Sequence, residues 1–370
     1  MKAITSAVIG CGVIGPDHFK AYAKCENVKV KWACDCVENK AVILKDRFAI
    51  EKHTTDYRDI LHDPEVDCVS VCTDHGSHAS IVCDSLKAGK HVLCEKALSS
   101  SRNGLAEMLA THAGRSDLVF SGVFQHRFDP VYRYIKYLLE EGRFGTLLTV
   151  SLQMMCFRSD RYYIADDWRG TWEREGGALL INQSIHFIDM IGWLSGGIAA
   201  VNGAWANLSH KDVMETEDTA VAAIEYECGA LGTIEATSSS NIDWEPTITV
   251  RGTEGSLDIR NARPLRVCFK DREQEREITS ELDRRIDGSS VGPQSKSYYG
   301  PSHPSQIADF IDAIRENRPP FVTARSACHA VDVVLSIYDS FSSGKRVVID
   351  SLKMFRDEEE RARVVEERDK

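Results

Sequence analysis

The stretch "AITSAVIGCGVIG", residues 3–15, decides the fold class of this 370-residue chain. Its first apolar run is typical of a buried strand, and the run leads directly into the turn Gly10-x-Gly12-x-x-Gly15. Asp35 ends the next strand-like run, 20 residues beyond Gly15. Glycines let a backbone approach a pyrophosphate, the following helix N-terminus favours its charge, and a carboxylate at this distance reaches the ribose. The stretch therefore predicts a strand–turn–helix unit that binds a dinucleotide.

Outward from this turn, short apolar runs alternate with amphipathic stretches as far as Gln125. The strand-like runs are "AITSAVIG", "KVKWACD", "VDCVSVCT", "HVLCEK" and "LVFSGVF", and helical patterns cover, for example, 77–88 and 100–113. Strands that alternate with helices imply parallel βαβ units. We therefore expect an α/β protein whose N-terminal Rossmann domain spans residues 1–125.

The second half has a different pattern, which predicts a second α/β domain over residues 126–350. A connecting helix over 129–145 closes at Gly142, and a further helix covers 176–194. Five strand-like runs then follow between 198 and 260, and short turns such as "ECGA" and "GTEG" indicate a broad, mostly antiparallel sheet. Helical patterns return at 304–317 and 326–341. We expect 271–300 to be a long polar loop and 351–370 to be a charged C-terminal tail.

Composition narrows the function classes. The net charge of −11 argues against nucleic acid or an anionic membrane as a partner. The N-terminus lacks the pattern of a signal peptide, and no Cys-x-x-Cys pair occurs among the 12 cysteines. Several cysteines lie in apolar runs, where a free thiol behaves as a small hydrophobe. These features predict a cytoplasmic protein without a disulfide framework and without a metal site.

Asp35 also bears on the choice of dinucleotide. Its carboxylate accepts hydrogen bonds from both ribose hydroxyls and repels a 2′-phosphate, and no Arg follows it in "DCVENK". The sequence therefore favours NAD over NADP. Besides the three glycines, Val13 and Ile14 of the turn are expected to lie against the cofactor.

Two further groups of polar residues are candidates for chemistry. Residues 73–78 and the pair Glu95 and Lys96 follow two neighbouring strand-like runs, so they belong to the carboxyl edge where open α/β sheets bind ligands. The helix "GGALLINQSIHFIDM", residues 176–190, carries Asn182, His186 and Asp189 at four- and three-residue spacing, on one face. This stripe is either a satisfied, half-buried structural feature or a catalytic face in a cleft.

These motifs together resemble the glucose–fructose oxidoreductase / inositol dehydrogenase (Gfo/Idh/MocA) family. The resemblance is carried by the glycine turn, "AGKHVLCEKAL", "QHRFDP" at 125–130, "DDWRG" at 166–170 and "GGALLINQSIHFID". It continues in "HPSQIADFIDAI" and "VVLSIYDSFSSGKRV" near the end. It implies an NAD-dependent oxidoreductase that acts on a carbinol of a sugar, nucleotide-sugar or cyclitol, and a homodimer or homotetramer formed through the second domain.

The resemblance also assigns roles to individual residues. Lys96 would hydrogen-bond the substrate hydroxyl, and His186, whose unperturbed pKa lies near neutrality, would be the acid/base. The expected cofactor-binding residues, besides the glycine turn and Asp35, are Thr73, His75, His78, Glu95, Lys96, Gln125, Trp168 and Arg169. The expected substrate-binding residues are Lys96, Arg127, Arg169, Asn182 and His186.

Three positions depart from the family pattern. Ala97 stands where Pro usually follows Glu-Lys, Asp74-His75 replaces Pro-Asn, and Asn182 replaces an Asp. The Asn variant resembles members that act on nucleotide-linked amino sugars. An amide orients a hydroxyl but accepts no proton, so Asn182 is expected to bind substrate and not to relay a proton. Asn182→Asp is expected to recreate the carboxylate of other family members and to retain turnover. A protein that binds NAD and a ligand without turnover, as a sensor or scaffold, is the alternative.

Overall fold

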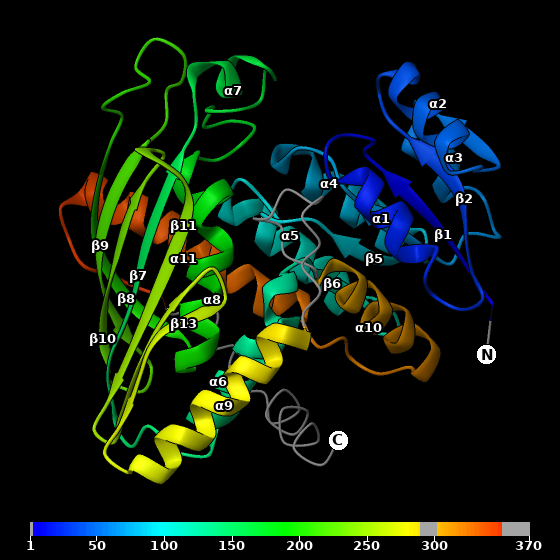
Figure 1. Cartoon of the computed structure of the whole chain (residues 1–370). Coiled ribbons are helices and arrows are strands. Elements are labelled where there is room, and N and C mark those ends of the chain that lie inside the picture. The colour runs from blue at the N-terminus through cyan, green and yellow to red at the C-terminus, as the bar shows by residue number, and fades with distance from the viewer. Residues whose placement is uncertain (1–2, 289–301, 350–370) are drawn as a thin grey trace. The chain divides into compact units, whose positions relative to one another are not determined.

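The chain forms two compact units, which Figure 1 shows with their element labels. The computed structural model describes residues 3–288 and 302–349. The first unit contains the described residues up to Gln125 together with Ser302–Cys328. The second unit contains the described residues from His126 to 288 and from His329 onward. Each unit has its own sheet.

The first unit is built on a six-stranded parallel sheet in the order β3-β2-β1-β4-β5-β6. Its strands are β1 (Ile4–Ile9), β2 (Val28–Cys34), β3 (Lys52–Thr54), β4 (Cys68–Val71), β5 (His91–Cys94) and β6 (Phe120–Gly122). The helices between them are α1 (Gly15–Tyr22), α2 (Glu38–Arg47), α3 (Tyr57–Leu61), α4 (His75–Lys87) and α5 (Arg102–Ala113). This strand order is that of the doubly wound dinucleotide fold, so the predicted Rossmann domain is confirmed.

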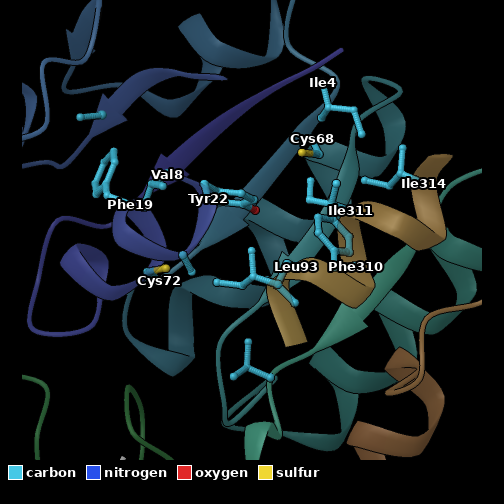
Figure 2. Packing of buried hydrophobic residues seen from close by; sticks show 14 of the residues in the cluster. Ile4, Val8, Phe19, Tyr22, Cys68, Cys72, Leu93, Phe310, Ile311 and Ile314 are labelled. Carbon is cyan, nitrogen blue, oxygen red and sulfur yellow. The ribbon is translucent and has the colours of Figure 1, made fainter. Parts of the chain in front are cut away.

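A helix from the C-terminal part of the chain completes the core of this unit. In α10 (His303–Glu316), Phe310, Ile311 and Ile314 pack with residues of the N-terminal strands and α1, as Figure 2 shows. The side chain of Gln306 also satisfies the end of β6, because its Oε1 accepts from Phe124 N at 3.0 Å and its Nε2 donates to Gly122 O at 2.7 Å. The units therefore differ from the sequence-based domains 1–125 and 126–350, since 302–328 joins the first unit.

The second unit has an eight-stranded sheet in the order β13-β12-β11-β7-β10-β9-β8-β14. Its strands are β7 (Leu147–Phe157), β8 (Ile198–Ala206), β9 (Thr219–Tyr226), β10 (Leu231–Thr237), β11 (Ser239–Gly252), β12 (Gly255–Arg260), β13 (Arg263–Phe269) and β14 (Val347–Val348). All neighbours are antiparallel except β7 and β10. The broad, mostly antiparallel sheet predicted for this half is therefore confirmed.

The remaining helices are η1 (Gln125–Phe128), α6 (Pro130–Glu140), α7 (Asp160–Ile164), the π-helix η2 (Leu179–Ser184), α8 (Ile185–Ser195), α9 (Arg272–Gly288) and α11 (Ala324–Ser343). The long loop expected over 271–300 is wrong for its first part, because α9 forms there. Ile278 and Leu282, four residues apart, are fully buried and anchor this otherwise polar helix. Residues 289–301 and the expected tail at 351–370 lie outside the described residues.

Two bulk features complete the description. The structure describes all twelve cysteines, and each is a free thiol. None of the helices within 3–288 and 302–349 combines the length and the apolar character needed to cross a bilayer.

Candidate active site

The glycine turn lies where the strand order of the first sheet reverses, between β1 and β4. Gly10 has φ +104°, and a Cβ there would lie 2.4 Å from the carbonyl oxygen of Cys72, so only glycine fits. A Cβ at Gly15 would lie 2.8 Å from Gly10 O, whereas a Cβ at Gly12 would meet nothing within 4 Å. Gly10 and Gly15 therefore close the turn, and Gly12 leaves open space beside the N-terminus of α1.

Asp35 directly follows β2 and faces this turn. Its Oδ2 accepts from Cys11 N at 2.9 Å, and its Oδ1 accepts from Val37 N at 2.9 Å. These two bonds fix the carboxylate and leave further lone pairs on each oxygen for a ribose diol. Val13, 57% exposed, and the half-buried Ile14 form the outer part of the turn. The turn, the start of α1 and Asp35 together fit the adenosine pyrophosphate half of a dinucleotide.

Thr73, His75 and His78 follow β4 and begin α4. His78 is fully buried, and its Nδ1 and Nε2 face the carbonyl oxygens of Ala97 at 2.8 Å and Thr73 at 3.1 Å. Burial lowers the pKa of His78, although the two carbonyl contacts act in the opposite direction. His78 thus ties the segment after β4 to the segment after β5. The direct cofactor contacts expected for these three residues stay predictions.

Glu95 and Lys96 follow β5, next to β4 in the sheet. Glu95 is buried, and its Oε1 lies 2.9 Å from His18 Nε2 and 3.6 Å from His303 Nε2. Burial alone would raise the pKa of Glu95, but the two histidines hold it well below its usual range. The other oxygen, Oε2, accepts from the backbone N–H of Lys96 at 3.1 Å. Glu95 therefore orients the backbone that carries the half-buried Lys96.

Sequence reasoning missed the partners of Glu95. His18 Nδ1 lies 2.9 Å from Ser70 Oγ, which lies 2.7 Å from Tyr22 Oη, and all three side chains are buried. His18 comes from α1, Ser70 from β4 and His303 from α10. A polar residue within the apolar run "CVSV" and a His in the first turn of α1 were the available signals.

The helix that carries the polar stripe begins as a π-helix, η2, and continues as α8. π-Helical turns are frequent at functional sites. The three stripe residues have different partners. Asp189 receives two bonds from the fully buried Arg127, from Nε at 2.9 Å and from Nη2 at 2.6 Å. This part of the stripe is structural, and the substrate contact expected for Arg127 stays a prediction.

His186, 7% exposed, lies in the first turn of α8 beside a second histidine that the sequence analysis did not single out. The rings of His126 and His186 meet edge to face, with centroids 5.3 Å apart. His126 Nδ1 lies 2.7 Å from Asp129 Oδ2. The block "QHRFDP" therefore supplies a His–Asp pair next to the expected acid/base.

Asn182, in η2, faces a buried carboxylate that was also missed. Asn182 Nδ2 donates to Glu175 Oε1 at 2.5 Å, and Glu175 Oε2 accepts from Gly170 N at 2.5 Å. Burial raises the pKa of Glu175, the bonds from Gly170 and Asn182 lower it, and Glu217 raises it further, to about 7. Glu175 is fully buried, whereas Asn182 is half-buried.

Glu217 caps the start of η2. Its Oε1 accepts from Leu180 N at 2.8 Å and from Tyr338 Oη at 2.7 Å, and its Oε2 accepts from Ala178 N at 3.1 Å. Burial raises the pKa of Glu217 to about 7 despite these bonds. The Tyr338 side chain also leaves room only for glycine at position 177. A Cβ at Gly177, which has φ +135°, would lie 2.1 Å from the Tyr338 hydroxyl. This explains Gly177, the second glycine of the Gly-Gly that opens the helix motif.

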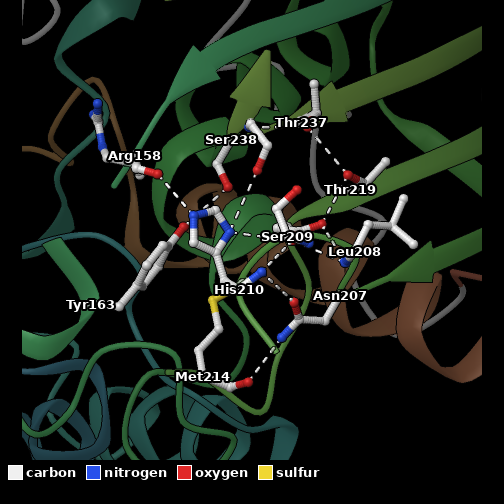
Figure 3. A network of polar contacts seen from close by, with 12 residues as sticks. Arg158, Tyr163, Asn207, Leu208, Ser209, His210, Met214, Thr219, Thr237 and Ser238 are labelled. Carbon is white, nitrogen blue, oxygen red and sulfur yellow. Dashed lines mark hydrogen bonds and ion pairs between the residues drawn. The ribbon is translucent and has the colours of Figure 1, made fainter. Parts of the chain in front are cut away.

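The residue after Glu217 anchors a loop, and Figure 3 shows the network. Asp218 accepts from the backbone N–H groups of Leu208, Ser209 and His210, at 2.6 to 3.2 Å. Burial alone would raise the pKa of Asp218, but these bonds hold it below its usual value. His210 Nδ1 faces Asp218 at 3.2 Å, and His210 Nε2 lies 2.9 Å from Arg158 O. These hydrogen bonds of Asp218 fix the backbone just before β9, and the neighbouring Glu217 reaches η2 from there.

The other expected site residues lie as follows. The guanidinium of Arg169 lies 4.0 Å from the ring centroid of Tyr162 and 5.4 Å from that of Trp168, and its Nε lies 2.9 Å from Asp166 Oδ2. Gln125 is fully buried at the start of η1.

Within the described residues, no three His, Cys, Asp or Glu side chains are grouped so that they could hold a metal ion.

Comparison with known proteins identifies two matching family models. Residues 4–123 match the oxidoreductase family model for the NAD-binding Rossmann fold, and residues 136–349 match the model for the C-terminal alpha/beta domain of the same family. Together the two models, GFO_IDH_MocA and GFO_IDH_MocA_C, cover more than half of the chain.

Individual relatives agree with these models. The uncharacterized oxidoreductase YrbE of Bacillus subtilis is 31% identical over 275 residues, which are 72% of this chain and 76% of the relative. The myo-inositol 2-dehydrogenase of Thermotoga maritima is 25% identical, over 85% of this chain and 90% of the relative. Among solved structures, the WlbA dehydrogenase of Bordetella pertussis in complex with NADH and UDP-GlcNAcA has a TM-score of 0.85 at 25% identity, over 94% of this chain and 98% of that chain.

Proposed function

This chain belongs to the Gfo/Idh/MocA oxidoreductase family, and on this basis we propose that it transfers a hydride between NAD and a secondary alcohol of a sugar, nucleotide-sugar or cyclitol. The observation that carries the proposal is the carboxyl edge of the neighbouring strands β2, β1, β4 and β5. There the glycine turn and Asp35 fit a dinucleotide, and Glu95 orients the backbone of Lys96.

NAD, when bound, supplies the hydride acceptor. The turn from Gly10 to Gly15 would hold its pyrophosphate, and Asp35 would accept from its ribose hydroxyls. Because the same carboxylate would repel a 2′-phosphate, we propose that NAD is preferred over NADP. Thr73, Gln125 and Trp168 are proposed as further cofactor contacts, as the family resemblance implies.

The substrate hydroxyl needs a proton acceptor and a stabiliser of the developing alkoxide. We propose that His186 takes the proton and that the Lys96 ammonium hydrogen-bonds the oxygen. The neighbouring His126, paired with Asp129, supports this role by giving the His186 ring a fixed edge-to-face packing partner. Asn182 and Arg169 are proposed to hold other substrate groups. Arg127, whose guanidinium is paired with Asp189, is the further substrate-binding residue that the family resemblance implies.

The test is NADH formation, followed by absorbance, with a panel of inositols, levoglucosan and UDP-sugars. Wild-type protein should oxidise at least one of these compounds. The Lys96→Ala variant should lose most of that turnover but should still bind NADH. NADH binding without turnover of any panel member would favour the sensor or scaffold alternative. Absence of NADH binding would contradict the proposal altogether.

We also propose that the protein self-associates through the second sheet. Val150, Leu152 and Met154 of β7 point into the unit, whereas the opposite face of the central strands carries apolar side chains that the described residues leave open. Leu231 of β10 is 57% exposed and Val221 of β9 is 50% exposed. Apolar groups on the central strands of a broad sheet are typical of an interface.

A further inference from the structure

We propose that Glu175 is a positioning residue that locks the amide of Asn182, so that its carbonyl oxygen and not its NH2 group is presented to the substrate. This inference rests on the proposed function, in which Asn182 holds a substrate group. It assigns Asn182 as a hydrogen-bond acceptor, and therefore predicts a substrate hydroxyl or NH donor at that place. It also gives a physical reason for an amide, and not a carboxylate, at this position of the chain.

The lock follows from the contacts of the Glu175 carboxylate. One oxygen accepts from Gly170 N and the other from Asn182 Nδ2, each at 2.5 Å. An ionised carboxylate has acceptors only, so the side of the amide that faces it must be the NH2 group. Because the amide is planar, Asn182 Oδ1 then points to the side away from Glu175. With a pKa of about 7, Glu175 is mostly ionised at pH 8 and above.

The same geometry sets the cost of a carboxylate at position 182. In Asn182→Asp, a carboxylate oxygen would stand where Asn182 Nδ2 now stands, within hydrogen-bonding distance of the buried Glu175. Two carboxylates that share a site cannot both ionise readily. Glu217 adds a third negative group close by, and Arg169 is the nearby cation. Asn182→Asp alone is therefore expected to impair the enzyme, which replaces the sequence-based expectation that it would retain turnover.

Exchange of the two groups should restore the pairing. In Glu175→Gln, the Gly170 N–H still needs an oxygen acceptor, so the new NH2 group faces residue 182. Asn182 must then turn over and present its own NH2 group to the substrate. In the double variant E175Q/N182D, the introduced amide donates to the introduced carboxylate, which again presents an acceptor oxygen to the substrate. E175Q reverses the donor and acceptor sides of residue 182, and N182D places two carboxylates together. Only the double variant again presents an acceptor oxygen to the substrate.

The kinetic experiment compares wild type, E175Q, N182D and the double variant at pH 8, with a substrate identified by the panel above. We expect kcat/KM to fall about tenfold or more in each single variant, mainly through KM, because a lost or inverted hydrogen bond to a bound group has about this effect. The double variant should return to within about threefold of wild type. Glu173→Gln, an exposed neighbour, is the matched control and should behave as wild type. NADH binding, measured by fluorescence, should be the same in all five proteins.

A second readout does not depend on any substrate. The urea midpoints of wild type, the two single variants and the double variant form a double-mutant cycle, in which the double variant should be more stable than the sum of the single effects predicts. If wild type oxidises no member of the panel, the proposed function fails and this cycle still decides the pairing. Additive stability effects would overturn the inference, and so would a double variant whose kcat/KM loss is the product of the single losses.

Discussion

Arg127, near the start of the second unit, is joined to Asp189 of α8 by two hydrogen bonds of 2.9 and 2.6 Å, and both side chains are buried. Trp193 adds a ring 5.9 Å from the guanidinium carbon. The pair fixes α8 to η1, and His126 and His186 lie on these same two elements. One member of the polar stripe is thus accounted for by structure, which leaves Asn182 and His186 for chemistry.

Asp189→Asn should destabilise the protein by about 3–5 kcal/mol, because it leaves a buried guanidinium without its counter-charge. Urea denaturation measures the loss. Glu225→Gln is the control, since it breaks an exposed pair with Arg346 and should change the midpoint little. A D189N protein of wild-type stability would contradict this structural role of the pair.

His186→Ala should slow the chemical step by about 10² to 10⁴, the usual range for loss of a general acid–base. NADH affinity should stay unchanged, because the dinucleotide turn and Asp35 belong to the other unit. Single-turnover NADH formation at several pH values is the measurement. A wild-type rate and pH profile would mean that His186 is structural.

Asp35→Ser should reduce the discrimination between NAD and NADP. We expect wild type to bind NAD at least about tenfold more tightly, which corresponds to about 1.4 kcal/mol, since the carboxylate would repel a 2′-phosphate. Fluorescence titration with both reduced cofactors measures the ratio. Equal affinities in wild type would contradict the proposed preference.

Glu175 and Glu217 should make the protein less stable as the pH rises. Their pKa values rise from 4.5 unfolded to about 7 folded, so the folded state holds more protons between these values. The stability contribution is complete below pH 4.5 and is lost as the pH rises through 7, at about 1.4 kcal/mol per pH unit for one such carboxyl. The two carboxyls interact, so they titrate as a pair, with Arg169 and Tyr338 facing them.

Glu217→Gln isolates this effect. Between about pH 5 and pH 8, the free energy of unfolding should fall less in the variant than in wild type. This holds whatever the difference between the two proteins is at about pH 5. Urea denaturation across this range is the measurement, and the exposed Glu26→Gln should follow the wild-type curve. Parallel curves for wild type and E217Q would refute the assignment.

Leu231→Asp should shift the protein toward the monomer, because it places a charge on the open face of the second sheet. Leu208→Asp, at a comparably exposed position in the loop after β8, is the control and should not. Light scattering at micromolar concentration distinguishes the two outcomes. A wild-type monomer under these conditions would contradict the proposed interface.

Local patterns in the sequence were sufficient for the Rossmann domain and for the antiparallel character of the second sheet. Strands buried on both faces read as apolar runs, half-buried strands alternate, and the glycine turn has fixed spacing. The strands β3 and β14, with three and two residues, carry too little signal, and the seven-residue β13 was not expected either. The assumed helical period of 3.6 also hid the π-helix η2, and the polar face of α9 hid its two buried anchors.

The tertiary structure decided which polar residues meet, because such pairings depend on chain segments that are distant in sequence. Asp189 is committed to Arg127, 62 residues away, and Glu95 to His18, 77 residues away. Residues 302–328 join the first unit because α10 fills a hydrophobic core that the N-terminal 125 residues do not close by themselves. A motif names the residue types available for chemistry, but the burial and partners that set their charge and orientation exist only in the folded chain.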